Sequence, residues 1–258
     1  MTWLATCAGF LALGFVLFIQ RNAGHRMAGL CVCLPLTSGP LTLALYLASG
    51  PEAARAAVAG SVEAIGGAAV SLTAFGLLRR WPLALSVPVT LATFASVVLA
   101  KDAMVGSPFQ AVLVTSVLIA LCAAVARASV REPAPSQRAK PRDWRIDVLA
   151  PFFLLGLVLL VAPQLSARWS GMLASAPVLA LSVLFSMRFG NASAGGVANV
   201  VQGTYDGLAA KLMFFVVLLA LLDFEGHAWI TFGFGAVACF TGGALLWRQN
   251  ALRTRAMT

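Results

Sequence analysis

Apolar residues follow one another in blocks of about 20 along almost the whole chain, separated by short segments that carry arginine or glycine and proline. A helix of about 20 apolar residues crosses roughly 30 Å of hydrocarbon. The alternating apolar and polar positions typical of a β-barrel are missing. The pattern predicts nine transmembrane helices, at Trp3–Ile19, Met27–Ala48, Ala53–Leu78, Leu83–Ala100, Phe109–Ala126, Ile146–Val161, Ser170–Met187, Gly195–Leu222 and Ala228–Leu246.

The loops differ in charge in a way that predicts topology. With the N-terminus outside, the outer loops carry only Arg55, Lys101 and Arg168, and the inner loops carry most of the remaining basic residues. Because basic residues accumulate on the cytoplasmic side, we expect a bacterial-type inner (plasma) membrane protein with its C-terminus in the cytoplasm. The basic excess is then topological, and we expect no nucleic-acid partner.

Composition indicates the class of protein, and one polar stretch divides the chain into two units. Apolar residues make up 60% and charged residues 10%, which excludes an ordinary soluble domain, where these fractions are about 45–50% and about 25%. The segment 128–145 is basic and proline-rich and predicts a cytoplasmic linker. It separates a first transmembrane unit, 1–127, from a second, 146–248, which is followed by a cytoplasmic tail, 249–258.

An internal repeat relates the two units. Arg26-Met-Ala-Gly29-Leu-Cys-Val-Cys-Leu-Pro35 has its arginine, glycine and proline at the same spacing as Arg168-Trp-Ser-Gly171-Met-Leu-Ala-Ser-Ala-Pro177. In the next helix of each unit, Gly60-Ser-Val-Glu63 matches Gly203-Thr-Tyr-Asp206. The matches pair the first four helices with the last four, and they leave Phe109–Ala126 without a counterpart. We therefore predict an all-α fold of two repeats in opposite membrane orientations, an arrangement characteristic of secondary transporters.

Three ionisable residues fall inside predicted helices rather than at their ends: Glu63, Asp206 and Lys211. A charge at the bilayer centre costs about 2.5–3.5 kcal/mol on insertion scales, so such residues usually face a cavity or a partner. We expect the two acids to share one pocket where small residues let their helices cross, and to bind protons there. The hydroxyls of Ser61, Thr204 and Tyr205 would supply hydrogen bonds, and Lys211 would pair with Glu63. The alternative is that the acids serve packing only and that Lys211 extends to the interface.

Prolines and glycines predict where helices deviate from regularity. Pro35, Pro40 and Pro177 interrupt corresponding segments, and broken helices at matching places indicate a transport site because they free backbone groups to contact a ligand. Simple proline kinks are the alternative. Gly66 and Gly67 are expected to add flexibility to the helix that carries Glu63.

Residues 20 to 100 resemble the small four-helix GlpM-type membrane proteins. The resemblance lies in Ala28-Gly29-Leu30, Pro35, Leu45-Tyr46 and the Gly50-Pro51-Glu52 turn before an alanine-rich helix. It implies an origin by duplication of a four- or five-helix unit and implies no substrate.

These observations favour a secondary transporter, driven by protons, for a lipid or a lipid-linked intermediate, because few polar residues lie near the predicted midplane to solvate a sugar or a multiply charged solute. A small-molecule substrate is also open. The alternative is a non-transporting subunit or scaffold that packs against a membrane protein partner or a second copy. Nucleophile, phosphate-loop and metal motifs are missing, so we expect no enzyme, cofactor or metal.

Overall fold

The computed structural model describes residues 25–78, 81–104, 106–129, 164–189, 194–222 and 228–255, together with a few single positions outside these ranges. All regular structure in this part of the chain is helical. In chain order the helices are α2 (His25–Cys33), α3 (Ser38–Ser49), α4 (Pro51–Leu77), α5 (Leu83–Met104), α6 (Pro108–Ser129), α8 (Ala167–Ala174), α9 (Val178–Phe189), α10 (Ala194–Leu221) and α11 (Ala228–Arg255).

Seven stretches of the described chain are helices long and apolar enough to cross a membrane. Two of these stretches consist of a pair of short helices, α2 with α3 and α8 with α9, and the other five are single helices. The prediction of an all-α, multi-pass membrane protein is thus confirmed at this level. The predicted helices Trp3–Ile19 and Ile146–Val161, and the linker 128–145 beyond Ser129, lie outside the described residues.

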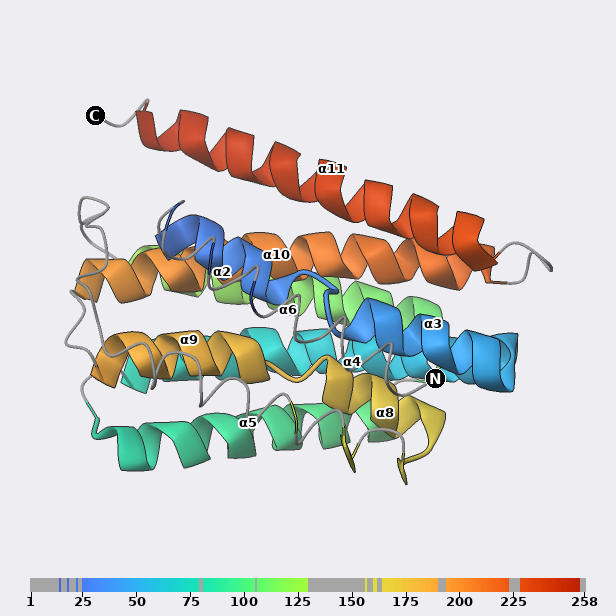
Figure 1. Cartoon of the computed structure of the whole chain (residues 1–258). Helices are drawn as coiled ribbons and strands as arrows, with labels where there is room; N and C mark the ends of the chain where they lie inside the picture. The colour runs from blue at the N-terminus through green and yellow to red at the C-terminus, as the bar shows by residue number, and fades with distance from the viewer. Residues whose placement is uncertain are drawn as a thin grey trace.

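The long helices α4 and α10 form the centre of the bundle, and α6 packs against both (Figure 1). Helix α2 packs most extensively against α10, and α8 packs most extensively against α4. The path from α2 to α3 runs opposite to the path from α8 to α9, so that α3 lies beside α8 and α2 beside α9 (Figure 1). Helices α5 and α11 lie at the periphery, each packed on one central helix.

Both paired helices are interrupted at a proline. Pro35 falls in the break between α2 and α3, and Pro177 falls in the break between α8 and α9, because a proline in a helix has no N–H to donate and its ring collides with the preceding turn. The two breaks touch, since the Thr37 hydroxyl donates to the Ala174 carbonyl at 3.3 Å. This carbonyl is one of those left free at the end of α8.

One other predicted interruption, at Pro40, is wrong, and the flexibility predicted at Gly66 and Gly67 stays a prediction. Pro40 lies in the first turn of α3, where no N–H is needed, so it begins a helix rather than interrupting one. Helix α4 continues without a break through Gly66 and Gly67. These glycines provide room for neighbours: the Lys101 ammonium and Thr115 approach Gly66, and Val98 and Phe94 approach Gly67.

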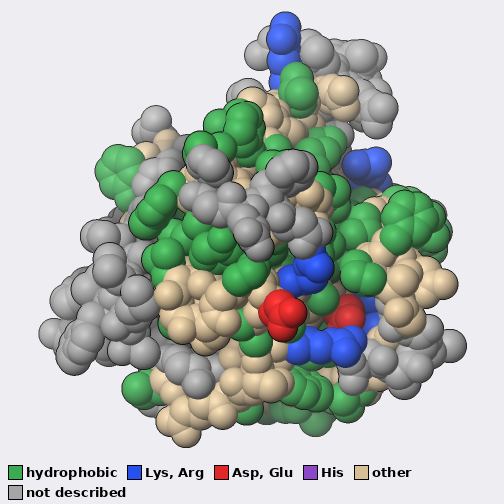
Figure 2. All heavy atoms as spheres, turned by 90° about the vertical axis from the view of Figure 1, so that its right-hand side faces the viewer, with side chains coloured by type: hydrophobic (Ala, Val, Ile, Leu, Met, Phe, Trp, Pro, Cys, Tyr) green, Lys and Arg blue, Asp and Glu red, His purple; other side chains and the backbone are tan. Residues whose placement is uncertain are grey.

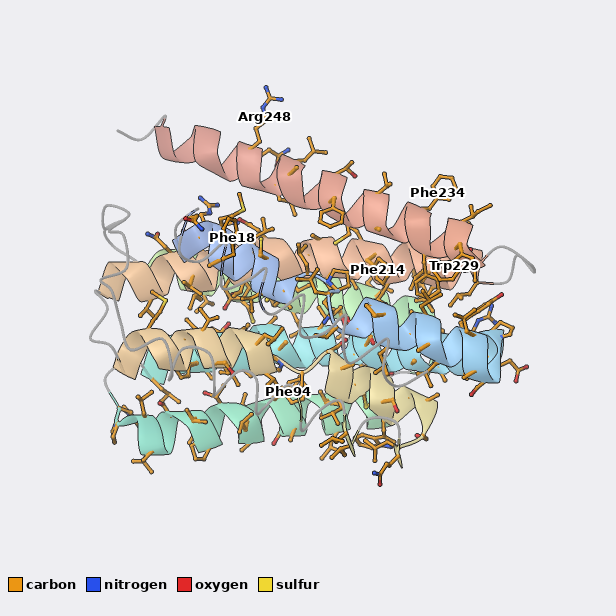
Figure 3. All side chains as sticks on the ribbon, viewed as in Figure 1. Phe18, Phe94, Phe214, Trp229, Phe234 and Arg248 are labelled. Atoms are coloured by element: carbon orange, nitrogen blue, oxygen red, sulfur yellow. The ribbon has the colours of Figure 1, made fainter. Side chains whose placement is uncertain are left out.

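The directions of a few large side chains show which helix faces point into the bundle and which point outward. Phe94 on α5 and Phe214 on α10 point into the bundle, whereas Phe234 and Arg248 on α11 point away from it (Figure 3). The ring of Phe214 packs edge-to-face on Phe232 of α11, with the ring centres 6.2 Å apart. The outer face of α11 is apolar and exposed, as expected for a surface in contact with lipid.

Candidate functional site

Two arginine–carboxylate pairs join the first part of the chain to the second. The Arg26 guanidinium at the start of α2 donates to Asp206 of α10 at 3.1 Å, and we call this the α2-side ion pair. The Arg168 guanidinium at the start of α8 donates to Glu63 of α4 at 2.7 Å, and we call this the α8-side ion pair. Both carboxylates are buried, with side chains 7% and 3% exposed. Seen from the end where α8 begins, basic and acidic side chains lie together among hydrophobic and other side chains (Figure 2).

Glycines bring the helices of the α2-side pair into backbone contact. A Cβ added to Gly29 would collide with the Val200 carbonyl of α10, and one added to Gly203 would collide with the Arg26 carbonyl of α2. Gly207 likewise faces the Leu30 carbonyl. The small-residue face of α10 therefore receives α2, and the prediction that it serves the crossing of α10 with α4 is wrong.

The α8-side pair has the same construction. A Cβ on Gly171 would collide with the Ala57 carbonyl of α4, and one on Gly60 would collide with the Arg168 carbonyl of α8. In each pair the arginine precedes the glycine of its own helix by three residues, and the acid follows the glycine of its own helix by three residues. Each contact thus joins residues of the predicted repeat from both units of the chain. The half-helix supplies an arginine and a glycine, and the central helix of the other unit supplies a glycine and an acid.

Glu63 and Asp206 do not share a pocket, so that prediction is wrong. Each is bound by a different arginine. Thr73, ten residues beyond Glu63 on α4, bonds at 2.6 Å to the hydroxyl of Tyr205, the neighbour of Asp206. Ten residues of helix are about 15 Å, so the two acids lie at different levels of the bundle.

The three predicted hydroxyl ligands of the acids bond elsewhere. Ser61 donates to the Gly171 carbonyl at 3.1 Å, Thr204 donates to the Val201 carbonyl at 2.6 Å, and Tyr205 bonds to Thr73. Ser61 and Tyr205 therefore join helices, whereas Thr204 bonds within its own helix. The second oxygen of Glu63, Oε2, is buried without a hydrogen-bond partner in the described part of the molecule.

Lys101, which the sequence places in an outer loop, is buried beneath Glu63. Its ammonium donates to the Thr115 hydroxyl at 2.5 Å and to the Glu63 backbone carbonyl at 3.2 Å. Thr115 in turn donates to the Val62 carbonyl at 3.0 Å. These bonds occupy two of the three ammonium donors and join α4, α5 and α6.

A cavity of about 30 Å³ lies between the two helix breaks, and we call it the central cavity. Its lining includes Leu34 and Thr37 from the first break, Ser175 and Pro177 from the second, Ala68 from α4 and Lys211 from α10. Lys211 is 5% exposed. The predicted pairing of Lys211 with Glu63 is wrong, because the carboxylate binds Arg168.

A second hollow, of about 670 Å³, lies between α6, α10 and α11, and we call it the lateral groove. Most of its lining is apolar, including Val112, Met213 and Val216. Ser116, Arg127, Tyr205 and Asp206 contribute the polar groups. The groove therefore combines a hydrocarbon-like wall with charged groups that include the acid of the α2-side pair.

The pairing of the two acids with arginines is the main feature of the site that the sequence analysis does not predict. Arg26 and Arg168 were recognised as members of a repeat, and the matched three-residue spacings of arginine to glycine and glycine to acid were the signal that could have paired them. Ser175 and Thr115 gave no signal, because a lone hydroxyl in an apolar helix usually bonds its own backbone. Among the described residues, no group of three histidine, cysteine or acidic side chains is placed to hold a metal ion.

Comparison with known proteins adds no relative: no family model, no curated protein and no solved structure matches the chain. The resemblance to GlpM-type proteins therefore stays a prediction.

Proposed function

We propose that the chain is a secondary membrane transporter whose two units, related as inverted repeats, move against each other around the central cavity. One observation supports this above all others: ion pairs of the same construction lie on both sides of a cavity formed by two crossing helix breaks. Ala68 lies five residues beyond Glu63 on α4, and Lys211 five beyond Asp206 on α10, each about 7.5 Å along its helix. The cavity is thus flanked by one pair on each side.

The opposed directions of the two broken helices favour inverted repeats. Helices α2 and α3 follow one another in the direction opposite to α8 and α9 (Figure 1). A parallel duplication would place matched helices in the same direction. We further propose the orientation that the basic residues favour, with the C-terminus and the start of α2 on the cytoplasmic side.

In this proposal the ion pairs are alternating gates. A pair that is intact holds its half-helix against the central helix, and a pair that is broken lets that end separate and admits water to the cavity. Protonation breaks a pair because it removes the carboxylate charge that the guanidinium binds. The unpartnered Oε2 of Glu63 offers a position for that proton, so Glu63 and Asp206 would couple opening to a proton gradient.

Cys33 provides the test, because it is buried at the end of α2 and lines the central cavity. In a variant with Cys7, Cys31, Cys122 and Cys239 replaced by alanine, Cys33 is the sole thiol. A membrane-impermeant thiol reagent is then applied to one or the other side of oriented vesicles. Arg26→Gln should increase labelling from the side where α2 begins, and Arg168→Gln should increase it from the opposite side.

The amide variants give a matched comparison, since Asp206→Asn and Glu63→Gln imitate the protonated acids. They should reproduce the labelling of Arg26→Gln and Arg168→Gln respectively. Arg248→Gln, which changes an exposed arginine that points away from the bundle, should leave labelling unchanged. If the gate variants label Cys33 from the same side, or not at all, the alternating-access proposal fails and a scaffold that packs against a membrane partner explains the bundle better.

The lateral groove favours a lipid as a second candidate cargo. Its volume of about 670 Å³ lies within the roughly 300–1,000 Å³ typical of ligand sites, and Arg127 could bind an anionic headgroup while the apolar wall holds acyl chain. Purified protein in liposomes should then accelerate the exchange of a fluorescent phospholipid between leaflets. Ala120→Trp, which fills the groove, should slow the exchange, and an unchanged rate would exclude the groove as the lipid path.

A further inference from the structure

We propose that the central cavity binds a small monovalent anion, held by the Lys211 ammonium, the Ser175 hydroxyl and the first turn of α9. That this anion is also the transported substrate rests on the proposed function, whereas its binding does not. The proposal differs from a lipid path, because the lateral groove contains none of these donors.

Lys211 is the first observation. It lies in the middle of α10, is buried, and lines the cavity. In the described part of the chain its ammonium makes no hydrogen bond, in contrast to Lys101, which is equally buried and bonds to Thr115 and Glu63. A lysine ammonium has three donors and no acceptor, and an unpartnered buried charge is costly. The cavity therefore presents a cation that an anion would satisfy.

Ser175 is a second, independent observation. It lies in the break after α8, is 2% exposed, and its Oγ is buried with no hydrogen-bond partner in the described residues. It lines the same cavity as Lys211. Most buried hydroxyls in proteins have a partner, so the Ser175 hydroxyl is a donor that a ligand in the cavity would satisfy.

The start of α9 adds a third group of donors. This 12-residue helix begins at Val178, beside the cavity, and Leu179 and Ala180 of its first turn belong to the lining. The Val178 amide already donates to the Ala176 carbonyl at 2.8 Å, which leaves the amides of Leu179 and Ala180 for a ligand. The helix dipole favours an anion there. One carbonyl that could oppose an anion, that of Ala174, is occupied by the Thr37 hydroxyl.

The size of the cavity limits the ligand. Its volume of about 30 Å³ compares with the roughly 10–15 Å³ needed on this scale for one water. It therefore admits an anion of one to three non-hydrogen atoms, such as chloride or formate, and excludes a lipid headgroup or a sugar in this conformation.

The first measurement is thermal unfolding of the purified full chain in detergent, with sodium gluconate replaced by sodium chloride or formate at constant sodium. Saturable binding should raise Tm by roughly 3–6 °C at tenfold excess over Kd. Lys211→Gln should abolish the shift, and Lys101→Gln, which changes an equally buried lysine away from the cavity, should retain it. If chloride and formate leave Tm of the wild-type chain unchanged, or shift Lys211→Gln equally, the anion site is overturned.

Moving the lysine tests the geometry. Ala68 is the repeat counterpart of Lys211 and lines the same cavity, so Ala68→Lys combined with Lys211→Ala should restore a chloride or formate shift that Lys211→Ala alone has lost. A double variant that folds without any anion response would contradict the assignment.

Protection of Cys33 keeps the test valid where lysine variants fail to fold. Chloride or formate should slow labelling of Cys33 in the chain with native Lys211, since the thiol lines the cavity. Anion protection without side-specific labelling of the gate variants would retain the anion site and reject transport. Side-specific labelling without any anion effect would retain transport and reject the anion site.

Discussion

The α2-side and α8-side contacts use the same backbone geometry in different surroundings. In both, an arginine in the first turn of a half-helix binds an acid in the middle of a central helix, and glycines let the two backbones touch. Beside Glu63 the space between the helices is filled by the buried Lys101, whose ammonium bonds to the Glu63 backbone carbonyl. Around Asp206 it opens into the lateral groove.

This difference separates the features that the two contacts share from those that each has alone. The glycines and ion pairs are equivalent and determine how the helices pack. The lysines are not equivalent: Lys211 stands where the first unit has Ala68, and α11 contains no lysine that could match Lys101. Two contacts of the same construction thus have different charged groups around them.

The largest effect on the free energy of unfolding should come from substituting the glycines that allow backbone contact. Gly171→Val and Gly29→Val each place a side chain against a carbonyl, of Ala57 and Val200 respectively. Neither carbonyl can move without displacing its helix, so each substitution should lower the free energy of unfolding by about 3 kcal/mol or more. Titration with SDS in mixed micelles provides the measurement.

The control for these variants is Gly233→Ala on α11, where an added Cβ meets nothing within 4 Å. It should be neutral or stabilising by up to about 1 kcal/mol, since alanine is the better helix former. A large loss in one of the two valine variants and none in the other would show that the two contacts are not equivalent, and would weaken the inverted-repeat proposal.

Sequence alone predicted the helical membrane fold, and it singled out the arginines, glycines and acids that form the two contacts. Apolar block length and the spacing of these residues are local properties. The breaks at Pro35 and Pro177 were predictable for the same reason, since a proline acts on its own helix. Pro40 was misassigned because its effect depends on where the new helix begins, which the sequence does not specify.

Pairing between distant segments could not be predicted in the same way. Glu63 was expected to meet Asp206 or Lys211 because all three are unusual inside a membrane. The structure instead pairs Glu63 with Arg168, which the charge distribution along the chain predicts in an outer loop. A residue at the boundary of a helix can extend to a buried partner, and neither hydropathy nor charge counting distinguishes that from exposure.

The smaller effect should come from the ion pairs, studied as double-mutant cycles. Glu63→Gln with Arg168→Gln, and Asp206→Asn with Arg26→Gln, should each show a coupling free energy of about 1–3 kcal/mol, because each pair is in direct contact. Glu63→Gln with Asp206→Asn should be additive within about 0.5 kcal/mol, since the two acids belong to different ion pairs at different levels of the bundle. Arg248→Gln, at an exposed arginine, should change stability by less than about 0.5 kcal/mol. The α8-side cycle should give the larger coupling, because its nitrogen–oxygen distance is 2.7 Å against 3.1 Å in the α2-side pair and the Coulomb energy of a charge pair falls with distance. Strong coupling between the two acids would instead indicate the shared pocket that this geometry excludes.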